Sequence, residues 1–305
     1  MSVPFDQVLS ILWNGVFGKQ ENSTAVSAVL SSRLPRVLTA LAVGAGLSAA
    51  GAAFQSLFAN PLATPDTVGV ASGSSFGAAL GILLGLGTIG TQGFSFLMGI
   101  AAVLLTWAVG SRKNRRLSSI VLAGIMVGSL FSALVSLVKF TADSESQLPA
   151  ITYFLMGTFA SSSFKRLAVG IFPITAGVLT LFLLRWRMNL LPYSEEEVRS
   201  FGVSLKKLRI VTLAAATLAT SASVAMCGQV GWIGLIVPHM CRMAFGNNHR
   251  SLLPASVSIG AAFMVIVDTI ARSVTATEIP VSVLTAIIGA PFFLYLMLKK
   301  GGWSL

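Results

Sequence analysis

Two ionisable residues lie inside an apolar stretch of the chain, where a charge is costly. Asp268 is flanked by apolar residues, and Arg272 follows four positions later, on the same side of a helix. An acid inside a membrane span is a candidate for ion or proton transfer, whereas an ion pair with the nearby arginine is the simpler interpretation. We prefer the ion pair.

The other chemistry-bearing residues form no catalytic or metal-binding pattern. His239 has no second ligand at metal spacing, and Cys227 and Cys241 do not form a CxxC pair. The sequence contains no G-x-x-x-x-G-K-[ST] loop, so we do not expect the chain to bind or hydrolyse ATP. We therefore predict a protein that is not an enzyme and has no metal or cofactor of its own.

A polar segment from Asn189 to Arg209 interrupts the second half of the chain. Ser194 is a favourable helix N-cap, three acids follow it, and the last of them, Glu197, can complete a capping box. Gly202 can supply the left-handed residue that ends such a helix. The spacing predicts a short helix, a tight turn and a second amphipathic stretch. That shape suits docking to a soluble partner, and a solvated loop fits the spacing equally well.

The composition places these residues in a membrane protein. Of 305 residues, 54% are apolar and 10% are charged, whereas charged residues make up roughly 25% of a soluble domain. Each apolar block must be a helix, because the membrane interior offers backbone groups no water. The sequence therefore predicts an all-α polytopic membrane protein. Nine blocks are clear: Val37 to Leu57, Val68 to Leu86, Phe94 to Val109, Leu117 to Val138, Leu167 to Leu184, Ile210 to Met226, Ile236 to Phe245, Leu252 to Ala271 and Val281 to Leu298.

Basic residues indicate how the helices are oriented. Alternating helices place four basic clusters on one face, which the positive-inside rule makes cytoplasmic, and the net charge of +11 then needs no nucleic-acid partner. Six basic residues fall on the opposite, outer face: Arg33, Arg36, Lys139, Lys165, Arg166 and Arg272. Such exceptions call for a functional explanation. For the lysines and Arg166, contact of snorkelling side chains with lipid headgroups is the alternative.

Glycines are concentrated in two segments. The second apolar block has one at every fourth position, which predicts a bare helix face for close packing, with contact to a transported substrate as the alternative. These are Gly69, Gly73, Gly77, Gly81 and Gly85. The segment from Gly228 to Gly234 is too glycine-rich for a plain span and predicts a broken helix, which a membrane tolerates only beside protein or a cavity. Broken helices favour a transporter over an inert anchor.

Several short motifs follow one another in a fixed order. They are Arg33-Leu-Pro-Arg36, Asn60-Pro-Leu-Ala63, Gly69-Val-Ala-Ser-Gly73, Gly234-Leu-Ile-Val-Pro-His239, His249-Arg250 with Leu253-Pro254, Glu278-Ile-Pro280 and Ile288-Gly-Ala-Pro-Phe292. In this order they resemble the FecCD-like permeases of bacterial and archaeal ABC importers, which carry iron-siderophores, haem, cobalamin and some oxyanions such as molybdate. The resemblance covers about Arg33 to the C-terminus.

The resemblance implies a particular architecture and set of partners. We expect one permease domain, residues 1–305, with about ten transmembrane helices, in the inner membrane of a bacterium or archaeon. The partners would be a second permease subunit, most simply in a homodimer, two cytoplasmic ATPases that bind ATP and magnesium, and an extracytoplasmic binding protein. Residues 1–32 hold only a weak apolar stretch, so we expect the first helix of the family to be lacking.

The resemblance also assigns roles to residues. Arg33, Arg36 and Arg272 correspond to outer-face arginines that receive acidic residues of the binding protein. Ser118 and Ser119 correspond to a cytoplasmic gate. The segment 189–208 corresponds to the coupling helices that seat in the ATPases, and its residues of interest are Ser194, Glu195, Glu196, Glu197, Arg199 and Gly202.

These features predict the permease subunit of an ATP-driven importer that works by alternating access at a permease dimer interface. Two rival classes are a secondary transporter driven by an ion gradient, for which Asp268 is the one good titratable candidate, and a membrane receptor or scaffold without transport. The sequence does not distinguish iron-siderophore from haem, cobalamin or molybdate as cargo. We prefer a ferric siderophore because such cargo dominates the family.

Overall fold

A computed structural model describes residues 3–16, 23–110, 117–275 and 277–298 of the chain. All regular elements in these ranges are helices, which agrees with the predicted all-α class. In chain order they are α1 (Phe5–Val16), α2 (Thr24–Ser27), η1 (Ala28–Arg33), α3 (Leu34–Leu57), η2 (Pro65–Val68), α4 (Val70–Leu83), α5 (Gly87–Gly110), α6 (Leu117–Thr141), α7 (Gln147–Leu155), α8 (Phe164–Met188), α9 (Glu195–Ser200), α10 (Leu205–Cys227), α11 (Ile233–Phe245), α12 (His249–Ser273) and α13 (Val281–Leu298).

Six of these helices are long and apolar enough to cross a membrane, and the first of them runs without a break from α2 through η1 into α3. The other five are α5, α6, α8, α10 and α12. Three shorter apolar helices, α4, α11 and α13, correspond to the remaining predicted blocks. All nine predicted blocks are thus helical, and the prediction of a polytopic helical bundle is confirmed.

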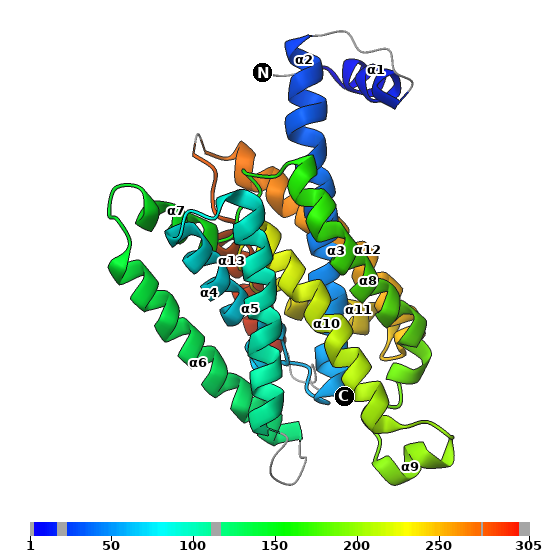
Figure 1. Cartoon of the computed structure of the whole chain (residues 1–305). Helices are drawn as coiled ribbons and strands as arrows, with labels where there is room; N and C mark the ends of the chain where they lie inside the picture. The colour runs from blue at the N-terminus through cyan, green and yellow to red at the C-terminus, as the bar shows by residue number, and fades with distance from the viewer. Residues whose placement is uncertain (1–2, 17–22, 111–116, 276, 299–305) are drawn as a thin grey trace.

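Helix α3 runs through the centre of the bundle and packs against α8, α10, α11 and α12 (Figure 1). Its small residues permit this, because they let neighbouring backbones approach closely. A Cβ atom on Gly51 would lie 1.9 Å from the carbonyl oxygen of Gly234 in α11, and one on Gly44 would lie 2.3 Å from that of Gly260 in α12. Both contacts require glycine.

The glycine-rich second block is a shorter helix than the sequence predicts. Gly73, Gly77 and Gly81 lie in α4 against α5, and a Cβ on Gly77 would lie 2.5 Å from the carbonyl oxygen of Phe94. Gly69 and Gly85 lie outside α4, so their assignment to the helix face is wrong. The physical reason is their backbone: both have positive φ, of +77° and +65°, which ends a right-handed helix.

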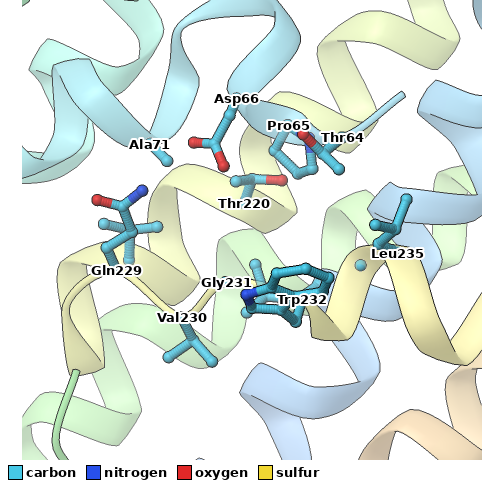
Figure 2. A pocket seen from close by; sticks show the side chains of 13 residues that line it. Thr64, Pro65, Asp66, Ala71, Thr220, Gln229, Val230, Gly231, Trp232 and Leu235 are labelled. Carbon is cyan, nitrogen blue, oxygen red and sulfur yellow. The ribbon is translucent and has the colours of Figure 1, made fainter. Parts of the chain in front are cut away.

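The predicted broken helix is present between α10 and α11. Helix α10 ends at Cys227, Gly228 has φ of +79°, and the chain turns through a non-helical stretch before α11 begins at Ile233. Trp232, directly before α11, has φ of +69°, a conformation that is uncommon for a residue other than glycine. This connection lies inside the bundle, beside η2 and α10 (Figure 2).

The N-terminal part of the chain forms α1, a helix of 12 residues. At 1.5 Å per residue it is about 18 Å long, too short to cross a hydrocarbon core of about 30 Å. It lies beside α2, at the end of the molecule opposite to α9 (Figure 1). Its buried residue Ile11 packs with Ala25 and Val29.

Candidate functional site

The bundle separates the predicted functional residues into two groups at opposite ends. Arg33 ends η1 and Arg36 lies in the first turn of α3, close to the last turn of α12 with Arg272. The short helix α9, which follows Ser194, lies at the other end of the molecule (Figure 1). The length of the helical bundle therefore separates the two groups.

The outer end contains an ionic cluster centred on Arg36. Its Nη2 atom lies 2.7 Å from Oδ1 of Asp268, and its Nε atom lies 3.0 Å from both carboxylate oxygens. Its Nη1 atom lies 2.6 Å from Oε1 of Glu278, in the connection between α12 and α13. Arg36 is 9% exposed, and the Asp268 side chain is 2% exposed. The cluster therefore links three segments of the chain inside the protein.

The predicted partner of Asp268 is the more distant of its two arginines. Nε of Arg272 lies 3.9 Å from Oδ2 of Asp268, which is a weaker contact than that of Arg36. Sequence spacing finds Arg272 because it lies on the same helix. Arg36 is 232 positions away, and its charge on the predicted outer face and its motif marked it as a docking residue and not as a partner of Asp268. Of the three predicted docking arginines, Arg36 is thus already bound to carboxylates of its own chain.

At the opposite end, α9 has the predicted capping geometry. The Ser194 hydroxyl accepts from the Glu197 backbone N–H at 3.3 Å, and the Glu197 carboxylate accepts from the Ser194 backbone N–H at 2.9 Å. The Ser194 hydroxyl also donates to the Glu197 carboxylate at 2.7 Å, and this bond, together with that from the Ser194 backbone N–H, lowers the pKa of Glu197 below its ordinary value. Gly202, with φ of +71°, follows the helix in the left-handed conformation expected of it.

Helix α9 has one buried face and a solvent-exposed tip. Val198 is fully buried and packs with Leu191, Leu205 and Leu208 of the bundle core. Phe201, after the helix, is 69% exposed, and a Cβ on Gly202 would meet no atom within 4 Å. The three acids and Arg199 are also exposed. The segment is thus fixed to the bundle on one side and open on the other.

The two serines assigned to the gate lie in the first turn of α6. Ser118 is exposed and Ser119 is partly buried. A Cβ on Gly110, the last residue of α5, would lie 3.2 Å from the carbonyl oxygen of Ser119, so the ends of α5 and α6 are close together. This placement, at the same end as α9, is compatible with a cytoplasmic gate.

A polar network at the base of the bundle was not found by sequence reasoning. The Asn189 side chain accepts from the backbone N–H of His249 at 2.9 Å and donates to the Asn248 side chain at 3.1 Å. His249 also hydrogen-bonds Ser56 in the last turn of α3. The network joins the ends of α8 and α3 to the start of α12, beside the coupling segment. The sequence analysis named His249 in a motif and Asn189 at the start of the polar segment, but nothing in their spacing placed them together.

In the part of the chain that the structure describes, no group of three or more potential metal ligands comes together. The His239 ring packs beside the ring of Phe293, with centroids 5.5 Å apart.

Comparisons with known proteins agree with these features. The model of the FecCD transport family matches residues 1–299, so the match includes the N-terminal segment that the sequence motifs did not cover. The molybdate import system permease protein MolB of Haemophilus influenzae is 41% identical, over 100% of this chain and 90% of that protein. A probable iron chelatin transport system permease protein of Helicobacter pylori is 35% identical, over 95% of this chain and 88% of that protein.

A solved structure is similar over nearly the whole chain. It is an inward-facing conformation of a transporter described as of the metal-chelate ABC type. It superposes with a TM-score of 0.86 at 37% sequence identity, covering 96% of this chain and 98% of that one.

Proposed function

The chain belongs to the FecCD transport family and is a membrane-spanning permease subunit of an ABC importer, and we propose that it takes up a ferric siderophore or a related metal chelate. Relatives with this family's fold are named for molybdate, iron chelates, cobalamin and haem. The iron chelatin permease and the similarity to a metal-chelate type transporter support a chelate, whereas the relative at 41% identity is named for molybdate.

The observation that carries the mechanism is the separation of two contact surfaces by one bundle. Arginines gather at the outer end, and the exposed, capped helix α9 lies at the opposite end (Figure 1). We assign the first surface to an extracytoplasmic binding protein and the second to a cytoplasmic ATPase that holds ATP and magnesium. Each nucleotide state of the ATPase must bind the two permease conformations differently, because a ligand shifts an equilibrium only through differential affinity.

We assign the cargo path to the interface between two copies of this chain. Helices α6 and α13 support the assignment, because both present many exposed large apolar side chains and α13 packs only lightly on the rest of the chain. Among them are Leu122, Met126, Leu130, Phe140, Ile287 and Leu294. The oligomeric state distinguishes a dimer interface from a lipid-facing surface. Cross-linking of cysteines placed on α13 in membranes would measure it.

The proposal is tested by uptake into proteoliposomes. The permease is reconstituted with its ATPase, and the binding protein is supplied with an iron-55 siderophore. We expect uptake that requires ATP and that disappears when the ATPase carries a substitution in its phosphate-binding lysine. Uptake that survives this substitution but collapses with a proton uncoupler would instead identify a secondary transporter. Docking of the binding protein without any flux would identify a receptor.

A further inference from the structure

Asp66 lies at membrane depth, in the short helix η2 between α3 and α4. Helix η2 packs on α6 about two turns from the cytoplasmic end of that helix, where a Cβ on Gly124 would lie 2.1 Å from the carbonyl oxygen of Thr67. Thr220, which lines the same cavity as Asp66, is about four turns from the cytoplasmic end of α10. The cavity therefore lies between the two membrane surfaces.

Asp66 is solvent-exposed in the single chain, although its helix η2 packs against α3, α4 and α6. In a single chain, a carboxylate exposed at this depth faces hydrocarbon, a second copy of the chain or an aqueous space. Hydrocarbon is excluded on energetic grounds, because charged side chains within spans turn towards the bundle interior or a water-filled cavity. The exposure of Asp66 therefore indicates water or the interface between two copies, and the cargo path that we assign to that interface meets both conditions.

The cavity is lined by three separate segments of the chain. Asp66 comes from η2, Thr220 from α10, and Gln229 and Trp232 from the connection between α10 and α11. Figure 2 shows the Asp66 carboxylate and the Gln229 amide extending towards the same space beside Thr220. Asp66 is the only ionisable side chain among the described residues that line the cavity, so no lining cation neutralises it.

The polar groups of this cavity lack partners within the protein. Thr220 is 1% exposed, and its hydroxyl has no hydrogen-bond partner among the described residues. A buried polar group without a partner is costly, so native proteins rarely contain one without a reason. The side chains of Asp66 and Gln229 likewise make no hydrogen bond with another residue in the described ranges. The three groups are thus available to water or to a ligand.

A role in helix capping does not account for Asp66. It lies four positions before Val70, where an acid could favour the positive end of α4. The N-cap of α4 is however Gly69, and no side chain caps the helix there. The backbone carbonyl of Asp66, and not its carboxylate, accepts the hydrogen bond from the Gly69 N–H at 3.0 Å.

Trp232 gives the cavity a rigid wall that leads to α13. A Cβ on Gly289 of α13 would lie 2.6 Å from the Trp232 ring, and the ring centroid of Phe293 is 6.2 Å away. The left-handed backbone of Trp232 is a conformation that persists only where the surroundings enforce it. The indole is therefore held between the cavity and the helix that we assign to the dimer interface.

We propose that Asp66, Thr220 and Gln229 form a polar subsite of the cargo path that accepts a cationic or hydrogen-bond-donating group and disfavours free oxyanions. This inference rests on the proposed importer function. When the cavity is hydrated and the carboxylate is ionised, it only accepts hydrogen bonds and it repels a dianion such as molybdate. The cavity volume of about 30 Å³ suits one or two waters or a single polar group. The subsite thus contacts one edge of a passing chelate.

The electrostatic part is tested with charged thiol reagents on the complete transporter in proteoliposomes. Gln229→Cys is made alone and together with Asp66→Asn, and its modification rates by cationic and anionic methanethiosulfonates are compared. With Asp66 present, we expect the ratio of the cationic to the anionic modification rate to be about ten times the ratio for a free thiol. The Asp66→Asn substitution should remove that preference. Wild-type protein is the unlabelled control, because Cys227 and Cys241 are buried.

Two outcomes would overturn the proposal. If neither reagent modifies Gln229→Cys in any nucleotide state, the cavity is not on an aqueous path. If the rate ratio is the same with and without Asp66→Asn, the carboxylate does not set the local potential. ATP-driven uptake by the wild-type protein is measured in the same vesicles, so failure of the importer function would be seen separately from failure of the subsite.

Selectivity is tested by uptake of two probes, molybdate and a ferric hydroxamate. We expect Asp66→Asn to raise the ratio of molybdate to hydroxamate uptake several-fold. Asp143→Asn, the same change at an exposed acid between α6 and α7, is the matched control and should leave the ratio unaltered. Equal ratios for wild type and Asp66→Asn would count against the subsite.

Discussion

Arg36 donates hydrogen bonds to Asp268 from two nitrogen atoms, at 2.7 and 3.0 Å, and thereby joins the first turn of α3 to the last turns of α12. Both side chains are withdrawn from solvent. A buried ion pair offsets its desolvation only while both members are present, so removing one member leaves an uncompensated charge. The pair therefore fixes how the outer ends of the two helices meet.

We expect Asp268→Asn to destabilise the protein by about 3 to 5 kcal/mol, because Arg36 is then left buried with one partner. Glu278→Gln is the matched change at the more exposed partner, whose side chain is 31% accessible, and should cost less. The apparent melting temperature in detergent measures both. A double variant, Arg36→Met with Asp268→Leu, should recover most of the loss, and equal melting temperatures for Asp268→Asn and wild type would contradict the assignment.

The two outer arginines that are less enclosed should control docking. We expect Arg33→Ala and Arg272→Ala to slow association of the binding protein several-fold at low salt, because rim charges act mainly on the encounter rate. Biolayer interferometry on nanodisc-embedded permease measures that rate. Arg185→Ala, at the coupling end, is the control. An association rate that does not respond to salt or to these changes would rule out electrostatic docking here.

The capping box of α9 should make its order depend on pH. Hydrogen bonds from Ser194 lower the pKa of Glu197, so the ionised carboxylate stabilises the folded helix. This stabilisation is fully present above the ordinary glutamate pKa of about 4.3, and it is lost as the pH falls through the lower pKa of the folded state. Hydrogen exchange of the α9 amides, corrected for intrinsic rates, measures it. Glu197→Gln should exchange faster than wild type at neutral pH, and the difference should shrink in acid. A constant difference across this range would show that ionisation is irrelevant.

Close packing of α4 on α5 gives a stability prediction with an internal control. We expect Gly77→Ala to destabilise the bundle by about 1 to 3 kcal/mol, because its Cβ would lie 2.5 Å from the carbonyl oxygen of Phe94. Gly93→Ala, within α5, should be neutral or slightly stabilising, because its Cβ would meet no atom within 4 Å and alanine is the better helix former. Equal falls in the melting temperatures of Gly77→Ala and Gly93→Ala would contradict the packing argument.

The spans could be predicted because hydropathy and length are local properties of the sequence. The capping of α9 could likewise be predicted from the sequence, since Ser194 and Glu197 are only three positions apart. The ends of α4 were not, because a glycine every fourth residue does not reveal which glycines have positive φ. Local spacing therefore predicts where helices occur better than where they stop.

Contacts between distant segments could not be predicted from the spacing of residues along the sequence. Arg36 and Asp268 meet only after α3 and α12 pack, so the sequence offered the nearer Arg272 in place of the true main partner. Asp66 was not selected because it lies between two apolar blocks and outside the quoted motifs. Its significance arises from Thr220 and Gln229, which folding brings to the same cavity.

The turn after α9 gives the sharpest test of coupling. Gly202 has φ of +71°, and its N–H donates to the Arg199 carbonyl at 3.0 Å. Gly202→Pro imposes φ near −65° and removes that donor, so the turn must reform, whereas Gly202→Ala keeps the donor and costs about 1 to 2 kcal/mol locally. We expect the proline variant to lose most transport per ATP hydrolysed while its melting temperature stays close to that of wild type, and the alanine variant to retain transport. Full ATP-driven uptake by Gly202→Pro would show that α9 and its turn do not transmit the movement of the ATPase.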